Sequence, residues 1–279
     1  MRVFVTGASG WIGSAVVPEL LDAGHEVVGL ARSDAAAEQI AASGAEVLRG
    51  GLDDLDVLRA GAADSEGVIH LAFVHDFTRP AEATQTDARA IEALGSALEA
   101  SGRPLVIASG LAGFAVGRAV TERDEPDERA YPRAANARAV LSLSGVRGVV
   151  VRLAGTVHGD GDPQFVTALV ARARERGVSA YVGDGANRWP AVHRSDAARL
   201  FRLAVEKAAA GSVLHGVAEE GVPVREIATV IGRHLDVPVV SVPAEEASEQ
   251  FGWLGRFVAA DLPASSALTR ELLGWEPTG

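Results

Sequence analysis

Residues 1–33 read MRVFVTGASGWIGSAVVPELLDAGHEVVGLARS and contain an apolar run, a glycine-spaced turn, an amphipathic stretch and a second apolar run. The run Arg2–Thr6 is short and β-branched, which is typical of a strand buried on both faces of a parallel sheet. Ile12, Val16 and Leu20 recur every fourth residue and predict a helix with one apolar face. This order predicts the strand, helix and strand of a dinucleotide-binding unit.

The three glycines of the turn have separate expected roles. Gly7 permits the tight turn, Gly10 lets a pyrophosphate approach the backbone, and Gly13 lets the helix pack against the strand. The free N–H groups at the start of the helix would face the phosphates. The predicted cofactor contacts in this turn are Gly7, Ser9, Gly10, Trp11, Ile12 and Gly13.

The composition narrows the possible partners and location. The 279 residues carry 26 Lys and Arg against 37 Asp and Glu, a net charge of −11, and no basic cluster interleaves with aromatic residues. Nucleic acid is therefore not an expected partner. The absence of cysteine excludes disulfides and thiol catalysis. No apolar run approaches about 20 residues, so we expect a cytoplasmic protein without a membrane partner.

The segment TGASGWIG, residues 6–13, matches the TGxxGxxG fingerprint of the extended and atypical short-chain dehydrogenases/reductases, and the chain resembles that superfamily along nearly its whole length. The resemblance implies an α/β fold: a Rossmann-like, doubly wound parallel sheet with a small C-terminal substrate lobe. We expect residues 1–155 and about 190–218 to form the NADP(H)-binding domain, and about 156–189 and 219–279 the substrate-binding lobe. Monomer and homodimer both remain open.

Periodicity and turn residues predict the other elements. Strands are expected at 25–30, 45–49, 68–73, 104–108, 146–153, 212–217 and 238–242, and helices at 35–43, 84–100, 165–176, 196–207 and 224–235. Residues 117–129 are charged and proline-interrupted, which predicts a surface loop.

The end of the second predicted strand bears on the choice of dinucleotide. An acidic side chain there would pair with the ribose 2′-hydroxyl, whereas an arginine accommodates a 2′-phosphate. Arg32 and Ser33 stand at this place and favour NADP(H) over NAD(H). Asp34 next door weakens the preference, so NAD(H) stays possible, and a solvated loop arginine is the alternative interpretation of Arg32.

Other cofactor contacts are implied by the resemblance. The family usually has an aspartate where Gly51 stands, so the contact to the adenine amino group is missing unless Asp53 replaces it. His70 lies within an apolar run and is interpreted as a core histidine rather than a catalytic one. The remaining predicted contacts are the Leu52 backbone, Leu71, Ala72 and Phe73 at the ribose and nicotinamide, and Leu153 at the nicotinamide amide.

The expected catalytic residues depart from the family pattern. Ser109 is the only hydroxyl where the family places its catalytic serine or threonine, and a structural role is an equal alternative. Tyr131 matches the family's acid, but Ala135 occupies the position of the lysine four residues later. Without that charge a phenol keeps a pKa of about 10 and is a weak proton donor at neutral pH. Ser109 and Tyr131 are therefore the only catalytic candidates.

The substrate is expected to contact a loop in the second half of the chain. Asn187, Arg188 and Trp189 offer a flat apolar platform with a charge, suited to a large aromatic ligand, although burial of Trp189 against Tyr181 is an alternative. Further candidates for a pocket wall are Phe251, Trp253, Leu254 and Phe257.

Two histidine and aspartate pairs have other expected roles. His193 and Asp196 match the family segment that braces the two lobes. His158 and Asp160 make no credible metal site.

Three functions remain from the sequence. The first is an NADPH-dependent ketoreductase for a bulky, polycyclic aromatic ketone, in kind with atypical ketoreductases of antibiotic biosynthesis that lack the Tyr-Lys pair, such as the simocyclinone ketoreductase. In that case hydride transfer dominates, and the substrate's own phenol can stabilise the alkoxide. The second is a non-catalytic NADP(H)-binding regulatory or redox-sensing protein. The third is a sugar-nucleotide epimerase or dehydratase.

Overall fold

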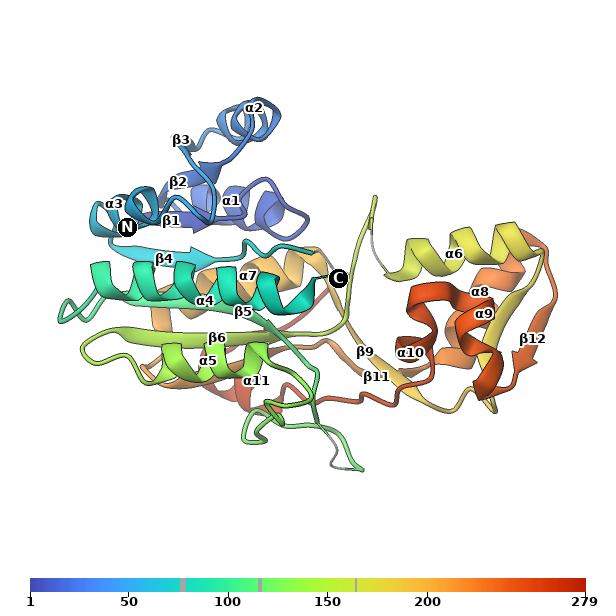
Figure 1. Cartoon of the computed structure of the whole chain (residues 1–279). Helices are drawn as coiled ribbons and strands as arrows, with labels where there is room; N and C mark the ends of the chain where they lie inside the picture. Colours follow the sequence, from blue (N-terminus) through green and yellow to red (C-terminus); the bar gives the residue numbers. More distant parts are fainter. Residues whose placement is uncertain (76–78, 115–116, 164) are drawn as a thin grey trace.

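The computed structural model describes residues 1–75, 79–114, 117–163 and 165–279. Its centre is a seven-stranded sheet with the order β10-β6-β5-β4-β1-β2-β3, in which every pair is parallel (Figure 1). The strands are β1 (Arg2–Thr6), β2 (Glu26–Ala31), β3 (Glu46–Arg49), β4 (Gly67–His70), β5 (Pro104–Gly110), β6 (Arg147–Leu153) and β10 (Ser212–Gly216). This confirms the predicted doubly wound α/β fold.

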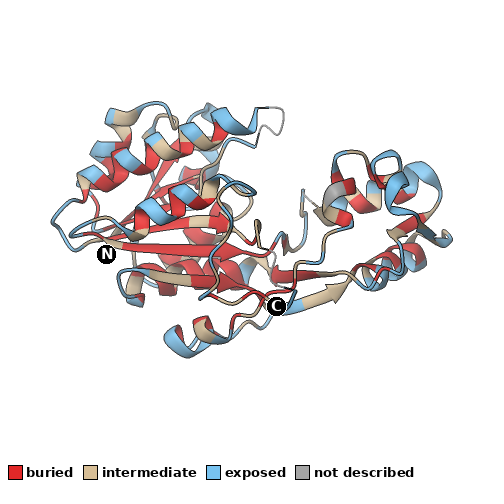
Figure 2. Cartoon of the chain, turned by 60° about the horizontal axis from the view of Figure 1, so that its bottom comes forward, coloured by how far each residue is buried: buried red, intermediate tan, exposed pale blue. Residues whose placement is uncertain are grey.

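Helices cover both faces of this sheet. One apolar cluster joins the sheet to α1 and α7, and a second joins it to α3, α4 and α5. Figure 2 shows the strands buried between helices whose outer sides are exposed. The helices of the larger part are α1 (Gly13–Asp22), α2 (Asp34–Ala42), α3 (Leu55–Ala63), α4 (Pro80–Ala97), α5 (Arg133–Leu141), α7 (Arg194–Lys207) and α11 (Ala267–Leu273).

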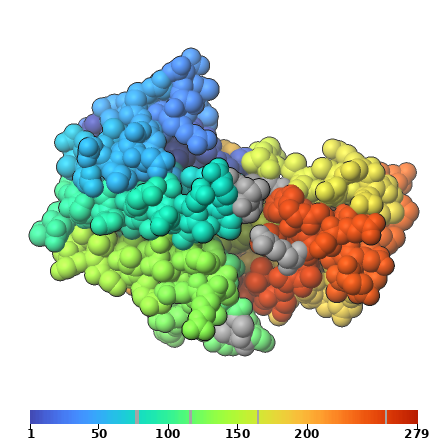
Figure 3. Space-filling model, in the orientation of Figure 1, coloured from blue at the N-terminus to red at the C-terminus, as the bar shows by residue number. Residues whose placement is uncertain are grey.

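A smaller part lies beside the carboxyl edge of the sheet (Figures 1 and 3). It has its own apolar cluster, built around Leu169, Trp189 and Phe251. Its elements are β7 (Thr156–His158), α6 (Phe165–Arg176), β8 (Ser179–Val182), β9 (Arg188–His193), β11 (Glu219–Pro223), α8 (Val224–Leu235), β12 (Val239–Val242), η1 (Ala244–Glu246), α9 (Ala247–Phe251), η2 (Gly252–Leu254) and α10 (Gly255–Val258). Strands β11, β9 and β7 form one sheet, and β12 and β8 form another.

Two sequence-based expectations are wrong in their extent. Strand β4 ends at His70 rather than at Phe73. The Leu71 N–H makes the last backbone bond to β1, to the Thr6 carbonyl, and the Ala72 N–H bonds the Thr6 hydroxyl instead of a backbone carbonyl. The expected surface loop at residues 117–129 carries two buried residues in its described part. Val120 pairs with Ala264, and Glu122 accepts hydrogen bonds from Thr269. A charge pattern does not reveal such partners from the distant C-terminal segment.

Among the described residues, none of the helices is both long and apolar enough to cross a membrane.

Candidate functional site

The glycine turn lies where the strand order reverses between β1 and β4, which is where open α/β sheets bind ligands. Gly7 has a φ of 69°, and a Cβ there would come within 2.7 Å of the Ala72 backbone nitrogen. A Cβ at Gly13 would overlap the carbonyl oxygen of Gly7. Gly10 is exposed, and its N–H bonds the Gly7 carbonyl at 2.9 Å. The backbone alone therefore fixes the shape of a loop that fits a pyrophosphate.

Trp11 fastens this loop to the smaller part of the molecule. Its indole Nε1 donates a hydrogen bond of 2.8 Å to the carbonyl of Val157 on β7. The guanidinium of Arg194 lies 4.3 Å from the ring centroid, within the range of a cation–π contact. The indole is thus engaged inside the protein, so the contact left for a cofactor at Trp11 is through its backbone.

The end of β2 presents a cation that is available to a ligand. Arg32 is exposed and forms no hydrogen bond or ion pair with any described residue. Arg49 donates to the Ser33 carbonyl at 2.7 Å and pairs with Asp34. The Ser33 hydroxyl accepts from the Ala36 N–H at 3.2 Å and caps α2. Because Arg49 compensates Asp34, the charge left open at this end is that of Arg32.

The turn that we expect beside the adenine ring is held by Asp54. Asp54 accepts a hydrogen bond of 2.7 Å from the Gly51 N–H. Asp53 pairs instead with Arg89 at 2.9 Å. The Leu52 backbone remains the predicted contact in this turn.

A buried polar network lies beneath the loop. The Thr6 hydroxyl is 2.7 Å from His70 Nδ1, and His70 Nε2 is 3.3 Å from Asp87. Asp87 also accepts from Asn136 at 2.7 Å and from Arg133 at 3.4 Å. Burial acts to raise the pKa of the Asp87 carboxyl, but the His70 hydrogen bond and the Arg133 charge outweigh it and lower that pKa.

This network looks like a hydroxyl–histidine–carboxylate triad, but it is not accessible to a substrate. Thr6, His70 and Asp87 are each 1% exposed or less. The network joins β1 and β4 to α4 and α5, and its role is to hold those elements together. The interpretation of His70 as a core histidine agrees with this burial.

The catalytic candidates meet at the end of β5. The Tyr131 hydroxyl accepts a hydrogen bond of 3.1 Å from the Gly110 N–H, next to the buried Ser109. This bond holds Tyr131 at the carboxyl end of β5. Ala135 is exposed on the first turns of α5.

A second buried polar cluster lies at the ends of β6 and β10. Arg152 is the strand partner of Ser109 and lies 5.3 Å from the Phe114 ring centroid. Arg152 donates to the Asp124 carbonyl at 2.8 Å and is 3.5 Å from His215 Nε2. Burial lowers the pKa of His215 to about 4, so its ring is neutral at pH 7 and Nδ1 donates to the Ser265 carbonyl at 2.8 Å.

The three predicted substrate residues all have partners within the chain. Asn187 donates to the carbonyls of Val258 and Ala260 at 2.7 and 3.0 Å. Arg188 forms a two-pronged ion pair with Asp261. Trp189 is 5% exposed, and its Nε1 donates to the Phe257 carbonyl at 3.1 Å. These contacts hold the smaller part together, and a substrate contact at these residues stays a prediction.

Four aromatic side chains gather in the smaller part. Phe165 lies edge-on to Trp189, Trp253 and Phe257, with centroids 5.8, 5.6 and 5.3 Å away. Trp253 is 51% exposed, whereas the other expected wall residues Phe251 and Leu254 are buried in the core. Helix α10 and the start of helix α6 lie on the side of the smaller part that is nearer the large sheet (Figure 1). We call Phe165, Trp189, Trp253 and Phe257 the aromatic cluster.

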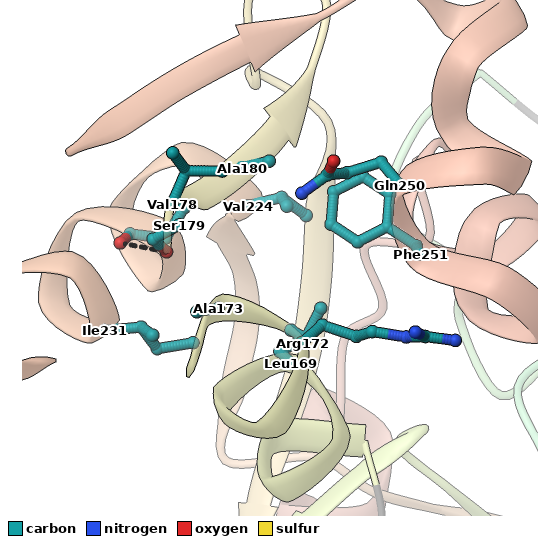
Figure 4. A pocket seen from close by; sticks show the side chains of 11 residues that line it. Leu169, Arg172, Ala173, Val178, Ser179, Ala180, Val224, Ile231, Gln250 and Phe251 are labelled. Carbon is teal, nitrogen blue, oxygen red and sulfur yellow. Dashed lines mark hydrogen bonds between the residues drawn. The ribbon is translucent and has the colours of Figure 1, made fainter. Parts of the chain in front are cut away.

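Two cavities differ in what they can hold. One inside the smaller part, lined by Leu169, Ile231 and Phe251, measures about 10 Å³ and has Ser179 bonded to the Ala228 carbonyl (Figure 4). It is at the lower limit for a single water molecule and is a packing gap. The other, about 70 Å³, lies next to the end of β5 between Leu111, Phe114 and Pro263. The described residues contain no group of three or more His, Asp or Glu arranged for a metal.

His193 and Asp196 join distant segments, as the brace interpretation expects. The His193 ring caps α7 and lies edge-on to His158, with centroids 5.4 Å apart. Asp196 is 1% exposed and accepts from the backbone N–H groups of Thr278 and Gly279.

Several residues of this site were not found from the sequence. Arg133 and Asp87 come from helices α5 and α4, and Arg152 and Glu122 surround His215. A positive charge two residues after Tyr131 was the available signal, but the family pattern directs attention to a lysine at position 135.

Relatives of known and unknown function match the whole chain. An uncharacterised protein of Schizosaccharomyces pombe is 52% identical over 281 residues, covering 100% of this chain and 95% of that protein. A 3-diazoavenalumate denitrifying reductase of Streptomyces is 30% identical, covering 100% and 96%. A 4-hydroxy-2-methyl-3-oxo-4-farnesyl-3,4-dihydroquinoline-1-oxide ketoreductase of Stigmatella aurantiaca is 28% identical, covering 100% and 88%.

Solved structures share the fold at low identity. The UDP-glucose 4-epimerase of Thermotoga maritima with UDP-glucose has a TM-score of 0.79 at 20% identity, covering 100% of this chain and 94% of that one. The UDP-glucose 4-epimerase of Thermus thermophilus in complex with NAD has a TM-score of 0.75 at 20% identity, covering 100% and 95%.

The family model for NAD dependent epimerases and dehydratases matches residues 3–215. That match spans the glycine turn, Tyr131, and the seven strands of the large sheet except the first residue of β1 and the last residue of β10. It confirms the prediction of a nicotinamide dinucleotide as the cofactor. The chain therefore belongs to the NAD dependent epimerase/dehydratase family, the extended short-chain dehydrogenases/reductases.

Proposed function

We propose that this protein is an NADPH-dependent ketoreductase that acts on a bulky, polycyclic aromatic ketone. The observation that carries the proposal is the carboxyl edge of the sheet, where the glycine turn leaves room for a dinucleotide and the Tyr131 hydroxyl lies on the Gly110 N–H beside Ser109. A hydroxyl at this place can approach a substrate carbonyl that stands in front of the glycine turn.

The cofactor residues fit NADP(H). The turn at Gly7, Gly10 and Gly13 leaves backbone room for the pyrophosphate, and Arg32 leaves an unpaired cation for a 2′-phosphate. The bound nicotinamide would supply the hydride. The chain's part is to hold that dinucleotide across β1 and β4, with Leu71, Ala72, Phe73 and Leu153 lining the nicotinamide half.

The proton comes from a hydroxyl at the end of β5, from water or from the substrate. Tyr131 and Ser109 are the residues placed to donate. An aromatic ketone with a neighbouring phenol can stabilise its own alkoxide, so such a substrate tolerates a weak protein acid.

The aromatic cluster supports the proposed substrate class. Half-exposed Trp253, in edge-to-face contact with Phe165 and Phe257, offers an apolar surface to a substrate. The relative from Stigmatella aurantiaca is named for a 3-oxo dihydroquinoline, a ketone in a fused ring system. We propose that residues 156–189 and 219–279 form the substrate lobe, with 1–155 and 190–218 as the NADP(H)-binding domain.

Two other functions are weaker. A sugar-nucleotide epimerase or dehydratase is supported by the fold neighbours, but the family chemistry relies on the lysine that Ala135 replaces. A regulatory or redox-sensing function, with NADP(H) bound and not turned over, would also account for the missing lysine at position 135.

An NADPH oxidation screen separates the three. Polycyclic ketones with a neighbouring phenol should be reduced, whereas UDP-glucose should be neither epimerised nor dehydrated. Trp253→Ala should raise the KM for the ketone about tenfold with little change in the KM for NADPH, because the contact is to substrate alone. Leu272→Ala, at an equally exposed apolar residue of α11, is the matched control. Binding of NADPH without turnover of any ketone would favour the regulatory function.

A further inference from the structure

We propose that Arg133 is the cation that holds the nicotinamide-side ribose of the dinucleotide, in place of the lysine that Ala135 replaces. The inference deepens the proposed function and rests on it. Arg133 is the first residue of α5, two residues after Tyr131.

The guanidinium is placed between the ends of two central strands. It lies 3.8 Å from the centroid of Phe73, which follows β4. Its Nη2 donates to the carbonyl of Ala108 near the end of β5 at 3.1 Å. The Tyr131 hydroxyl bonds the backbone of Gly110, two residues further along the same strand, which is a separation of about 7 Å along β5. The side chains of Arg133 and Tyr131 thus lie close together at the carboxyl edge of the sheet.

Arg133 has donors to spare. A guanidinium carries five N–H groups, and the described residues occupy two of them, Nε with Asp87 and one on Nη2 with Ala108. Its side chain is 19% exposed, so the group is not sealed in the core. Ribose hydroxyl oxygens are acceptors that the remaining N–H groups can bind.

The contacts that Arg133 already makes serve to aim it. Stacking on Phe73 fixes the plane of the guanidinium, and the Asp87 carboxylate, anchored by His70 and Asn136, holds its Nε. Arg152, a second cation at the carboxyl edge of the sheet, donates to the Asp124 carbonyl, lies beside His215 and is only 7% exposed. Arg133 is therefore the better placed of the two for a ligand.

The test compares a whole dinucleotide with its adenosine half. Arg133→Met should weaken NADP(H) binding about tenfold or more, because one or more hydrogen bonds from a charged donor are lost. The same variant should bind adenosine 2′,5′-bisphosphate within about twofold of the wild type, since that ligand ends before the nicotinamide ribose. Arg133→Lys should retain part of the affinity, and Arg133→Met combined with Ala135→Lys should recover it. Isothermal titration calorimetry measures the affinities of the wild type and the three variants for both ligands.

Arg138→Met is the matched control, because Arg138 lies on the same helix, is exposed and pairs with Glu128. The proposal is overturned if Arg133→Met binds NADP(H) as tightly as Arg138→Met, or if it weakens both ligands equally, which marks a general structural effect. Thermal unfolding shows separately whether Arg133→Met is folded. If it is not, its binding data are set aside, and Arg133→Lys decides: NADP(H) affinity equal to that of Arg138→Met then overturns the proposal. If the wild type binds no dinucleotide at all, the proposed function fails rather than this assignment.

Discussion

The carboxyl edge of the large sheet has two halves that are built differently. At the ends of β1, β2 and β4 lie the glycine backbone and exposed Arg32, whose sequence follows the family pattern; we call this the cofactor half, because we propose that it binds the cofactor. At the ends of β5, β6 and β10 lie mostly buried side chains, where Tyr131 lacks its lysine and Arg152 packs beside His215; we call this the reaction half, because we propose that it faces the substrate carbonyl. A site specified by backbone geometry tolerates little change, whereas a site specified by side chains can exchange one charged group for another.

The buried histidines of the two halves show the same contrast. His70 contacts the carboxylate of Asp87, and the pair lies under the glycine turn. His215 has an arginine beside it and donates to a carbonyl, so burial keeps it neutral. The histidine of the cofactor half thus has a carboxylate as its partner, whereas the histidine of the reaction half has a guanidinium beside it.

The largest expected effect tests the backbone half. Gly13→Ala should abolish dinucleotide binding and destabilise the protein by about 1–3 kcal/mol, because the new Cβ overlaps the Gly7 carbonyl.

Gly10→Ala should keep the melting temperature, since its Cβ meets only the Gly7 oxygen at 3.1 Å. It should still lower the affinity for the dinucleotide about hundredfold, because the new methyl group blocks the phosphates. Calorimetry and thermal unfolding check both, and normal binding by Gly10→Ala would contradict the assignment of the turn.

Acid should act on the reaction half first. The folded state holds the pKa of His215 at about 4, below its usual 6.5, so the stability from its neutral form is full above pH 6.5 and is lost as pH falls toward 4. The loss should reach about 3 kcal/mol. Glu122, Arg152 and Asp124 are the charged groups that face the ring.

Replacing the ring should remove that pH dependence. His215→Asn should flatten the fall in unfolding free energy between pH 6.5 and 4, measured by urea unfolding. His234→Asn, at an exposed histidine of α8, should leave it unchanged. An identical slope in both variants would place the acid sensitivity elsewhere.

Cofactor choice should shift by about tenfold. Arg32→Ala removes the open cation at the end of β2 and should lower the NADPH over NADH preference by that factor. Arg49→Met should lower it too, because Asp34 then loses its compensating charge and repels the phosphate. Arg59→Ala, an exposed arginine of α3, is the control. An unchanged preference in Arg32→Ala would show that Arg32 does not bind the phosphate.

The smallest effect is expected at Tyr131. Tyr131→Phe should reduce kcat by less than about tenfold. With alanine in place of the lysine at position 135, Tyr131 is already a weak proton donor, and substrate or water can supply the proton instead. The lost hydrogen bond to Gly110 should cost about 1 kcal/mol of stability. A fall in kcat of several orders of magnitude, with the melting temperature kept, would make Tyr131 the essential acid.

The sequence by itself determined the fold class, the glycine turn and the nicotinamide cofactor. Those features depend on local patterns: apolar strands, spaced glycines and an amphipathic helix within the first 33 residues. It also showed that a lysine is absent at position 135 and that Arg32 follows the second strand. Glycine patterns are readable because they reflect steric limits on the chain itself.

Only the tertiary structure decided which side chains meet. Asp87 and Arg133 are 46 residues apart, Glu122 and Thr269 are 147 apart, and Trp11 reaches Val157 across 146. Trp189, expected as a substrate platform, is bonded inside the smaller part, while Trp253 is exposed. Such pairings depend on how helices and loops pack on the sheet, and no local pattern in the chain encodes the partner of a buried charge or the face that an aromatic ring presents.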